Sequence, residues 1–320
     1  MKPIQVIYHK ADFDGLFCRE IARKHFGDMA DYIGWDYGDP LPVVLKRQED
    51  GLPGCYLYML DISVDGLMDY PGLVWIDHHK SAIDKFPSSI NGYRIDGVAA
   101  CRLAWHYFTC VKAGWLERNQ WADKQHYIDR IVSEPLAVRL AGEYDIWDKR
   151  DPRAELFQHG LRSRDITNDW PLLLSIETPQ TISQLEARLA AGDRFEIEPD
   201  GSVMPAIVFS LLESGKVVQY TKTKENESIA KQFAFTFAWE GLTFCAINAA
   251  RYNSHLFTAG IKPEHDALFG FNFDGKQWRV SLYHAPGKEH HDLSLIAVKH
   301  GGGGHRGACG FKLTKLPFTP

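Results

Sequence analysis

Histidine and aspartate side chains gather in short motifs along this chain of 320 residues. The first motif is His9-Lys-Ala-Asp12-Phe-Asp14-Gly15. One imidazole and two carboxylates at this spacing suit Mn²⁺ or a similar ion with mixed ligands. A single Asp could instead cap a helix, but that role would leave the second Asp and His9 unexplained. Gly15 would let the backbone approach a bound group closely.

A second motif, Val74-Trp-Ile-Asp77-His78-His79, places two imidazoles and a carboxylate at the end of an apolar segment. Successive residues of a strand point in opposite directions, so we expect His78 and His79 to do different jobs. One would bind a metal ion and the other would face the substrate. Asp77 could accept a hydrogen bond from an imidazole N–H and fix its tautomer.

Two further motifs carry carboxylates. Asp61 ends the apolar segment Tyr56–Leu60, a position that favours a ligand bridging two ions, although an isolated Asp there would more often serve a turn. The stretch 141–148 offers Glu143, Asp145 and Asp148, any of which could reach the ions. Two ions held close together can activate water and stabilise the leaving oxygen of a phosphoester. The motifs therefore indicate metal-dependent phosphoester hydrolysis.

A glycine-rich motif lies near the C-terminus, where Gly301–Gly304 is followed by His305 and Arg306. Bare backbone N–H groups of successive glycines can form a nest for an anion, and the imidazole and guanidinium add donors for phosphate. A flexible linker is the alternative, but it is not expected inside a strand-rich region. We expect the substrate to be bound by Gly302, Gly303, Gly304, His305 and Arg306.

The elements that must position these motifs alternate along the first half of the chain. Short apolar segments that indicate strands are Ile4–Tyr8, Tyr56–Leu60 and Leu73–Ile76, and helical periodicity covers Leu16–Phe26, Val98–Val111 and Asp123–Leu140. This alternation predicts a doubly wound parallel sheet with helices on both faces. Ligands of such sheets bind at the carboxyl ends of the strands, where the motifs fall.

The second half changes from helices to strands. Helices are predicted over Ile182–Ala191 and, despite Gly215, over Ser202–Lys231; strands are predicted over Phe233–Trp239, Leu242–Asn248, Leu268–Phe273, Trp278–Tyr283 and Gly310–Leu313. Glu-Gly and Asp-Gly pairs between strands indicate hairpins. We therefore expect an α/β protein with a catalytic domain over 1–190, a helical linker over 191–232 and a smaller α/β domain with a mixed sheet over 233–320, with the active site in the interdomain cleft.

The composition of the chain excludes several classes of binding partner and site. The formal net charge of −5 argues against binding long duplex DNA, which usually needs a basic surplus. No apolar run is long enough for a membrane span or a signal peptide. The six cysteines form no C-x-x-C pair, so neither a zinc ribbon nor a disulfide framework is expected. A cytoplasmic protein, as a monomer or an oligomer, fits these features.

Taken together and in this order, the motifs resemble those of the DHH phosphoesterase superfamily with its associated C-terminal substrate-binding domain. Members include RecJ-type exonucleases, oligoribonucleases and phosphatases of bisphosphorylated adenosine. The resemblance implies that the metal ligands are His9, Asp12, Asp14, Asp61, His78 and Asp145, with Asp61 bridging two divalent ions. It also implies that His79 contacts the scissile phosphate, that Asp77 supports the His pair, and that the glycine-rich segment grips the substrate.

The resemblance and composition together predict a phosphodiesterase that uses two Mn²⁺ ions, with Mg²⁺ as the alternative. Its expected substrate is a short single-stranded oligonucleotide or a small nucleotide. A phosphomonoesterase, a pyrophosphatase or a cyclic-dinucleotide phosphodiesterase remains open. An alternative of another class is a nucleotide-binding regulatory module without turnover.

Overall fold

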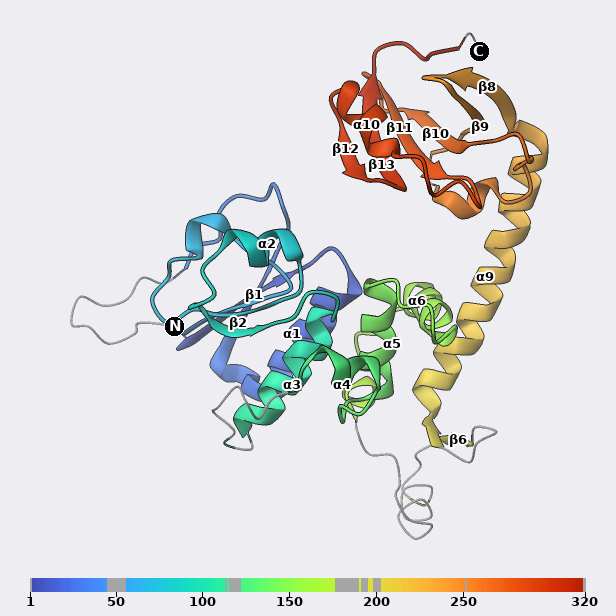
Figure 1. The fold of residues 1–320 in the computed structure, drawn as a ribbon. Coiled ribbons are helices and arrows are strands. Elements are labelled where there is room, and N and C mark those ends of the chain that lie inside the picture. The colour runs from blue at the N-terminus through green and yellow to red at the C-terminus, as the bar shows by residue number, and fades with distance from the viewer. Residues whose placement is uncertain are drawn as a thin grey trace. The chain divides into compact units, whose positions relative to one another are not determined.

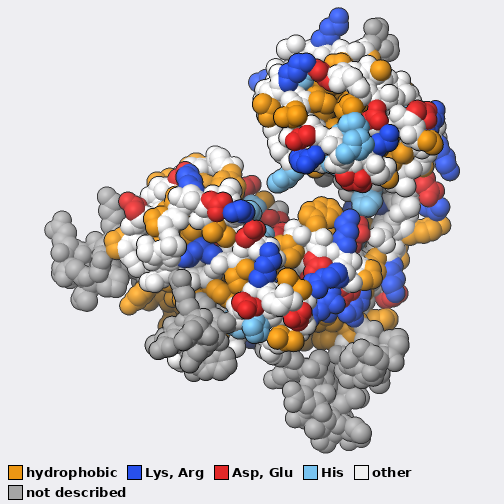
Figure 2. All heavy atoms as spheres, in the orientation of Figure 1, with side chains coloured by type: hydrophobic (Ala, Val, Ile, Leu, Met, Phe, Trp, Pro, Cys, Tyr) orange, Lys and Arg blue, Asp and Glu red, His pale blue; other side chains and the backbone are white. Residues whose placement is uncertain are grey.

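The computed structural model describes residues 2–44, 56–112, 114, 122–175, 190, 195–197, 203–250 and 252–318. The chain divides into two compact units, Met1–Lys216 and Val217–Pro320 (Figure 1). Figure 2 shows Lys and Arg interspersed with Asp and Glu on the visible surface of both units. This mixture agrees with the small net charge of the chain.

The first unit is built on a five-stranded parallel sheet with the order β2-β1-β3-β4-β5. Its strands are β1 (Ile4–His9), β2 (Ala30–Trp35), β3 (Tyr56–Leu60), β4 (Val74–Asp77) and β5 (Asn91–Arg94). Alternation along β1 sends Val6 into the core on one face of the sheet and Ile7 into the core on the other. Burial on both faces explains why β1, β3 and β4 are almost continuously apolar.

Helices cover both faces of this sheet. Helices α1 (Phe13–Phe26) and α3 (Ala100–Lys112) lie side by side on one face, and α2 (Lys80–Lys85) packs on the other (Figure 1). The remaining helices on the side of α1 are α4 (Lys124–Ile128), α5 (Leu136–Asp145), α6 (Arg153–Ser163) and α7 (Trp170–Leu173). Short 3₁₀ turns are η1 (Gly27–Met29) and η2 (Asp65–Leu67).

The prediction of one continuous helix over Asp123–Leu140 is wrong, because α4 and α5 are separate helices. Pro135 stands immediately before α5 and disfavours helical backbone in the residue that precedes it. Arg130, just after α4, has a positive φ of 57°, which ends the first helix. The helical spacing of apolar residues continues through this stretch of the sequence, although the proline interrupts the helix itself.

Helix α9 (Ala206–Phe233) is continuous through Gly215, and its first residues pack against α6. A Cβ on Gly215 would lie 1.9 Å from the carbonyl oxygen of Leu156, and one on Gly160 would lie 2.0 Å from that of Leu211. These glycines therefore let the two helix backbones approach closely. A small antiparallel pair, β6 (Phe195–Ile197) and β7 (Val203–Pro205), precedes α9.

The second unit contains a six-stranded mixed sheet with the order β12-β13-β11-β10-β9-β8. Its elements are β8 (Phe235–Trp239), β9 (Leu242–Asn248), η4 (Ser254–Phe257), β10 (Ala267–Phe273), β11 (Trp278–His284), α10 (Leu293–Lys299), β12 (Gly303–His305) and β13 (Ala308–Leu313). Strands β9 and β10 pair in parallel, and the other neighbours are antiparallel. Glu240 and Gly241, with φ of 51° and 76°, form the predicted turn between β8 and β9.

The predicted fold class is confirmed: a parallel α/β unit is followed by an α/β unit with a mixed sheet. The domain limits and the interdomain active site remain predictions, and the helix predicted over Ile182–Ala191 lies almost wholly outside the described residues. Within the described part of the chain, no helix is long and apolar enough to cross a membrane.

Candidate metal centre

The predicted ligands of the first unit meet at the carboxyl edge of the parallel sheet. His9 ends β1, Asp61 follows β3, and Asp77 ends β4 ahead of His78. The chain leaves β1 toward β2 on one side and returns to β3 on the other, so the sheet order reverses between β1 and β3. Such a switch point opens a crevice where ligands of α/β sheets bind. His9 and Asp61 lie at this point.

The first cluster, which we call the His9 group, contains His9, Asp12 and Asp61. Nδ1 of His9 lies 2.9 Å from Oδ2 of Asp12 and 3.4 Å from Oδ2 of Asp61. Within the group, one ligand atom from each residue lies within 4.8 Å of the others. One imidazole nitrogen and two carboxylate oxygens at this spacing can hold a divalent ion.

The second cluster, which we call the His78 group, contains Asp14, His78 and Asp145. Nε2 of His78 lies 3.2 Å from Oδ2 of Asp145 and 3.6 Å from Oδ2 of Asp14. Residues from α1, the end of β4 and the end of α5 thus converge on one imidazole nitrogen. This group repeats the chemistry of the first, with one imidazole and two carboxylates.

Asp61, a member of the His9 group, also reaches the His78 group. Its Oδ2 faces Nδ1 of His9 at 3.4 Å, and its Oδ1 faces Nε2 of His78 at 3.5 Å. The side chain is buried, yet among the described residues neither carboxylate oxygen has a hydrogen-bond partner. A buried carboxylate without donors is unfavourable unless a cation compensates its charge. The two oxygens therefore face imidazoles of two different groups, where a cation could compensate the charge.

The backbone of Asp61 is also strained, with a φ of 61°. A non-glycine residue in this left-handed region costs about 1–3 kcal/mol, and such residues are concentrated at functional sites. The N–H of Asp61 donates to the carbonyl of Ile76 on the neighbouring strand at 2.9 Å. The sheet therefore holds the conformation that turns the carboxylate toward both histidines.

Burial and repulsion shape the charges of these carboxyls. Burial raises the pKa of Asp14, Asp61 and Asp145 to about 7, and neighbouring carboxylates add to the effect. The carboxylates of Asp12 and Asp61 raise the pKa of His9 to about 11. A dense cluster of acids whose ionisation is costly without a counter-charge is the donor set that a divalent cation fits.

Two of the aspartates also cap helices. Oδ1 of Asp12 accepts a hydrogen bond from the N–H of Gly15 at 3.0 Å, while Oδ2 faces His9. Asp14 is buried and accepts from the N–H groups of Ala100 and Cys101 at 2.9 and 2.7 Å, at the start of α3. Helix capping and metal binding are thus compatible roles for these side chains.

Asp77 holds His79 in place. Its Oδ1 lies 2.7 Å from Nδ1 of His79 and accepts from the N–H groups of His78 and His79, while its Oδ2 accepts from the indole N–H of Trp75. Burial opposes ionisation of Asp77, but the contacts with His79 outweigh it and lower the pKa of this carboxyl. The hydrogen bond with Asp77 raises the pKa of His79 to about 9. His79 is 41% exposed and can meet a ligand.

The structure separates the three acids of the fourth motif. Glu143 is buried and binds the guanidinium groups of Arg130 and Arg139. Asp148 pairs with Arg150 at 2.5 Å. Only Asp145 of these three acids lies in the described metal-binding groups.

Asp36, which follows β2, is a site residue that the sequence motifs did not predict. Its Oδ1 lies 3.3 Å from Nε2 of His9, the ring nitrogen that the His9 group does not use. Histidines that bind metals usually donate their other N–H to a carboxylate or carbonyl, which fixes the ring. Asp36 ends a strand as Asp61 does, and the same reasoning would have found it had β2 been predicted.

In the second unit, the glycine-rich segment is ordered by its neighbours. The N–H groups of Gly301 and Gly302 donate to carbonyls of Val298 and Ala297 at the end of α10, at 3.0 and 2.8 Å. These two amides are therefore not available to an anion. A Cβ on Gly302 would lie 2.1 Å from the carbonyl oxygen of Gly310, so close packing on β13 requires glycine there.

The rest of this motif is more accessible. Gly303, Gly304 and His305 form β12 and are exposed. Arg306 donates to the carbonyl of His290 at 3.2 Å. Substrate binding by the predicted residues remains a prediction, with the amide of Gly302 already bonded to Ala297; these residues are Gly302, Gly303, Gly304, His305 and Arg306.

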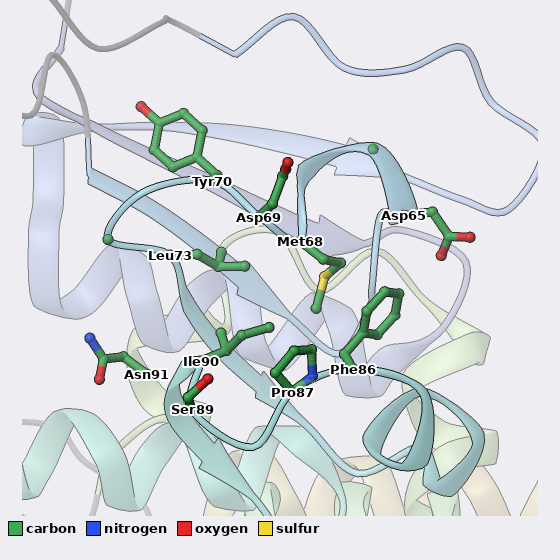
Figure 3. A pocket seen from close by; sticks show the side chains of 12 residues that line it. Asp65, Met68, Asp69, Tyr70, Leu73, Phe86, Pro87, Ser89, Ile90 and Asn91 are labelled. Atoms are coloured by element: carbon green, nitrogen blue, oxygen red, sulfur yellow. The ribbon is translucent and has the colours of Figure 1, made fainter.

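A pocket of about 600 Å³ lies elsewhere in the first unit, among residues that precede β4 and β5. Met68, Leu73, Phe86 and Ile90 supply its apolar wall (Figure 3). Its position at the amino ends of these strands separates it from the metal-binding groups.

Comparison with known proteins gave structural likeness only: no family model and no curated protein matches the chain. Solved structures similar to it include a pGpG-specific phosphodiesterase from Vibrio cholerae, at 15% identity and a TM-score of 0.46, covering 98% of this chain and 94% of that one. Another is the DHH domain of a protein from a family of ribosomal proteins, at 13% identity, a TM-score of 0.48 and coverage of 98% and 83%.

A third is exonuclease RecJ bound to manganese, at 13% identity and a TM-score of 0.43, covering 97% of this chain and 85% of that one.

Proposed function

We propose that this chain is a DHH-type phosphoesterase that hydrolyses phosphodiesters with two divalent metal ions. The main support for this proposal is the position of Asp61. Its buried carboxylate faces His9 with one oxygen and His78 with the other. Neither oxygen has a hydrogen-bond partner among the described residues. Asp61 belongs to the His9 group and also forms, with His78 and His79, a further set of possible ligands. This arrangement suits a pair of ions better than a single ion. The ligands proposed for the pair are His9, Asp12, Asp14, Asp61, His78 and Asp145.

Divalent ions bound there would supply charge neutralisation for the phosphate and a nucleophile from water. The chain supplies the rest. Asp77 holds Nδ1 of His79, which leaves Nε2 as the ring atom that can meet a phosphate oxygen. With its raised pKa, His79 carries a proton near neutral pH and can hand it to the leaving oxygen.

We propose a short oligonucleotide or a small nucleotide as the substrate, with Mn²⁺ favoured because two imidazoles take part in ligation. A net charge of −5 gives little general attraction for a long polyanion, so a compact substrate drawn to the metal site is favoured. A nucleotide-binding module without turnover is the contrasting hypothesis.

A substrate panel tests the proposal. The protein is incubated with Mn²⁺, with Mg²⁺ or with a chelator, and with a dinucleotide, a pentanucleotide, a cyclic dinucleotide, bisphosphorylated adenosine or pyrophosphate. We expect metal-dependent hydrolysis of the dinucleotide or pentanucleotide. Metal binding shown by calorimetry, with no hydrolysis of any compound, would instead support the binding module.

His79→Ala separates chemistry from metal binding. We expect this variant to keep Mn²⁺ affinity within a few fold, because Asp77 rather than a proposed ion holds Nδ1 of His79. Its turnover should fall roughly 100-fold or more, the usual contribution of a positioned acid. Equal loss of metal binding and turnover would show that His79 is a ligand and not the proton donor.

A further inference from the structure

Trp147 is the residue whose position the proposed chemistry does not explain. It lies two residues after Asp145 and is 61% exposed, with a φ of 56°. The N–H of Trp147 donates to the carbonyl of Tyr144 at 3.1 Å, and that of Asp148 donates to the carbonyl of Glu143 at 2.8 Å. These two bonds form the capping motif in which the left-handed residue is usually glycine.

A large side chain at this position therefore strains the backbone, and its exposed ring gains little burial in return. Residues held in such conformations are concentrated at ligand sites. Two peptide units join Trp147 to the proposed ligand Asp145, which keeps their Cα atoms within about 8 Å. Trp147 therefore lies on the short segment that carries a proposed ligand.

The surroundings of Trp147 combine aromatic rings with cations. The ring of Tyr144 lies 5.7 Å from it at an interplanar angle of 32°, and Nζ of Lys149 lies 5.3 Å from its centroid. The guanidinium of Arg162 lies 5.7 Å from the ring of Tyr144. In Figure 2, Lys and Arg side chains gather over α5 and α6. We call Tyr144, Trp147, Lys149 and Arg162 the aromatic platform.

We propose that the aromatic platform stacks a nucleobase of the substrate beside the scissile phosphate, an inference that rests on the proposed function. Aromatic rings interleaved with cations are the usual surface for single-stranded nucleic acid. Base stacking is stronger than an exposed cation–π contact, so a base can displace Lys149 from the indole. The freed ammonium and Arg162 would then face the phosphates. The platform would select nucleotides over pyrophosphate.

The test compares a dinucleotide with its abasic analogue, using Mn²⁺, in wild type, Trp147→Gly and Trp147→Phe. Glycine suits the backbone at this position, so Trp147→Gly should fold at least as stably as wild type while lacking the ring. We expect its preference for the dinucleotide over the abasic analogue, as a ratio of kcat/KM, to fall about tenfold, mainly through KM. Trp147→Phe should keep most of the preference.

Tyr56→Ala is the matched control, because Tyr56 is an aromatic residue 53% exposed at the amino end of β3. It should leave the preference unchanged. An unchanged preference in Trp147→Gly would overturn the platform while leaving the phosphoesterase proposal intact, and would favour Trp147 as a protein-docking residue.

A second measurement does not depend on turnover. The dinucleotide is titrated against intrinsic fluorescence in the presence of Ca²⁺, and the signal of Trp147→Phe is subtracted from that of wild type. Quenching assigned to Trp147 supports the platform even if no phosphoester is hydrolysed, in which case only the proposed activity fails. Absence of quenching, with dinucleotide binding shown by calorimetry, would overturn the platform.

Discussion

The two edges of the parallel sheet in the first unit differ in the kind of site that they carry. The amino edge holds a roomy pocket of about 600 Å³ with apolar walls (Figure 3). The carboxyl edge holds buried acids with raised pKa values and an Asp61 whose oxygens have no hydrogen-bond partner in the described chain. The proposed site thus lies where buried carboxylates lack hydrogen-bond partners among the described residues, and not where the sheet offers an open apolar volume.

Among the substitutions considered, Asp61→Asn at the carboxyl edge should reduce metal binding and turnover most. The amide keeps the size of the side chain but cannot bridge two cations. We expect Mn²⁺ affinity and turnover each to fall by more than roughly 100-fold, beyond the loss usual for residues that only support ligands. Calorimetry with Mn²⁺ and the hydrolysis assay measure both effects. Normal turnover in this variant would refute the two-metal centre.

Asp36→Asn tests whether the carboxyl edge extends to β2. The Asn side chain can still accept a hydrogen bond from Nε2–H of His9. It lacks the negative charge with which Asp36 stabilises the proton on that nitrogen. We expect Mn²⁺ affinity to fall roughly 10-fold, at the lower end for partners of metal-binding histidines. Asp31→Asn is a control, since Asp31 lies near the start of β2 and pairs with Lys2 at 3.5 Å. Equal effects of the two substitutions would remove Asp36 from the site.

The buried carboxyls of the carboxyl edge should make the stability of the metal-free protein depend on pH. Burial raises the pKa of Asp14, Asp61 and Asp145 from 3.8 in the unfolded chain to about 7. Protonation then favours the folded state, so their contribution is present at low pH and is lost as the pH rises toward 7. We expect Tm without metal to be lower at pH 8 than at pH 5. Mn²⁺ should raise Tm more at pH 8, because binding needs ionised carboxylates.

The control for this behaviour is Asp61→Asn, in which one buried carboxyl is removed. Its metal-free Tm should fall less between pH 5 and pH 8 than that of wild type. A wild-type Tm that rises over this range would contradict the raised pKa values.

Asp65→Asn at the amino edge should have the smallest effect. Asp65 lines the pocket and pairs with Lys85 at 2.5 Å, but the two side chains are 70% and 54% exposed. Exposed ion pairs contribute about 1 kcal/mol or less. Denaturant unfolding should therefore change little, and Mn²⁺ affinity should stay as in wild type. A large loss of metal binding would contradict the separation of the two edges.

Much of the fold was predictable because β1, β3 and β4 are apolar segments bounded by clear turns. Strand β2 was not predicted, since Ala30–Trp35 contains an Asp and a Gly among its six residues and forms no continuous apolar segment, and Asp36 was missed with it. The order of strands in the sheet also places Asp61 between the two histidines, and no local pattern contains that information.

The choice among Glu143, Asp145 and Asp148 could not be made from spacing. Residues two apart on a helix point to nearly opposite sides, and the sequence does not tell which side faces the sheet edge. In the structure, Arg130 and Arg139 bind Glu143, whereas Asp145 lies next to His78. Likewise, the partners of Asp14 are amides 86 and 87 residues further along the chain.

That last contact offers a spectroscopic reporter. Asp14 joins the proposed metal centre to the first two amides of α3, those of Ala100 and Cys101. In an NMR titration, paramagnetic Mn²⁺ should broaden the signals of these two amides early, whereas diamagnetic Mg²⁺ should only shift them. Two buried backbone resonances would thus record occupancy of the site without any substrate.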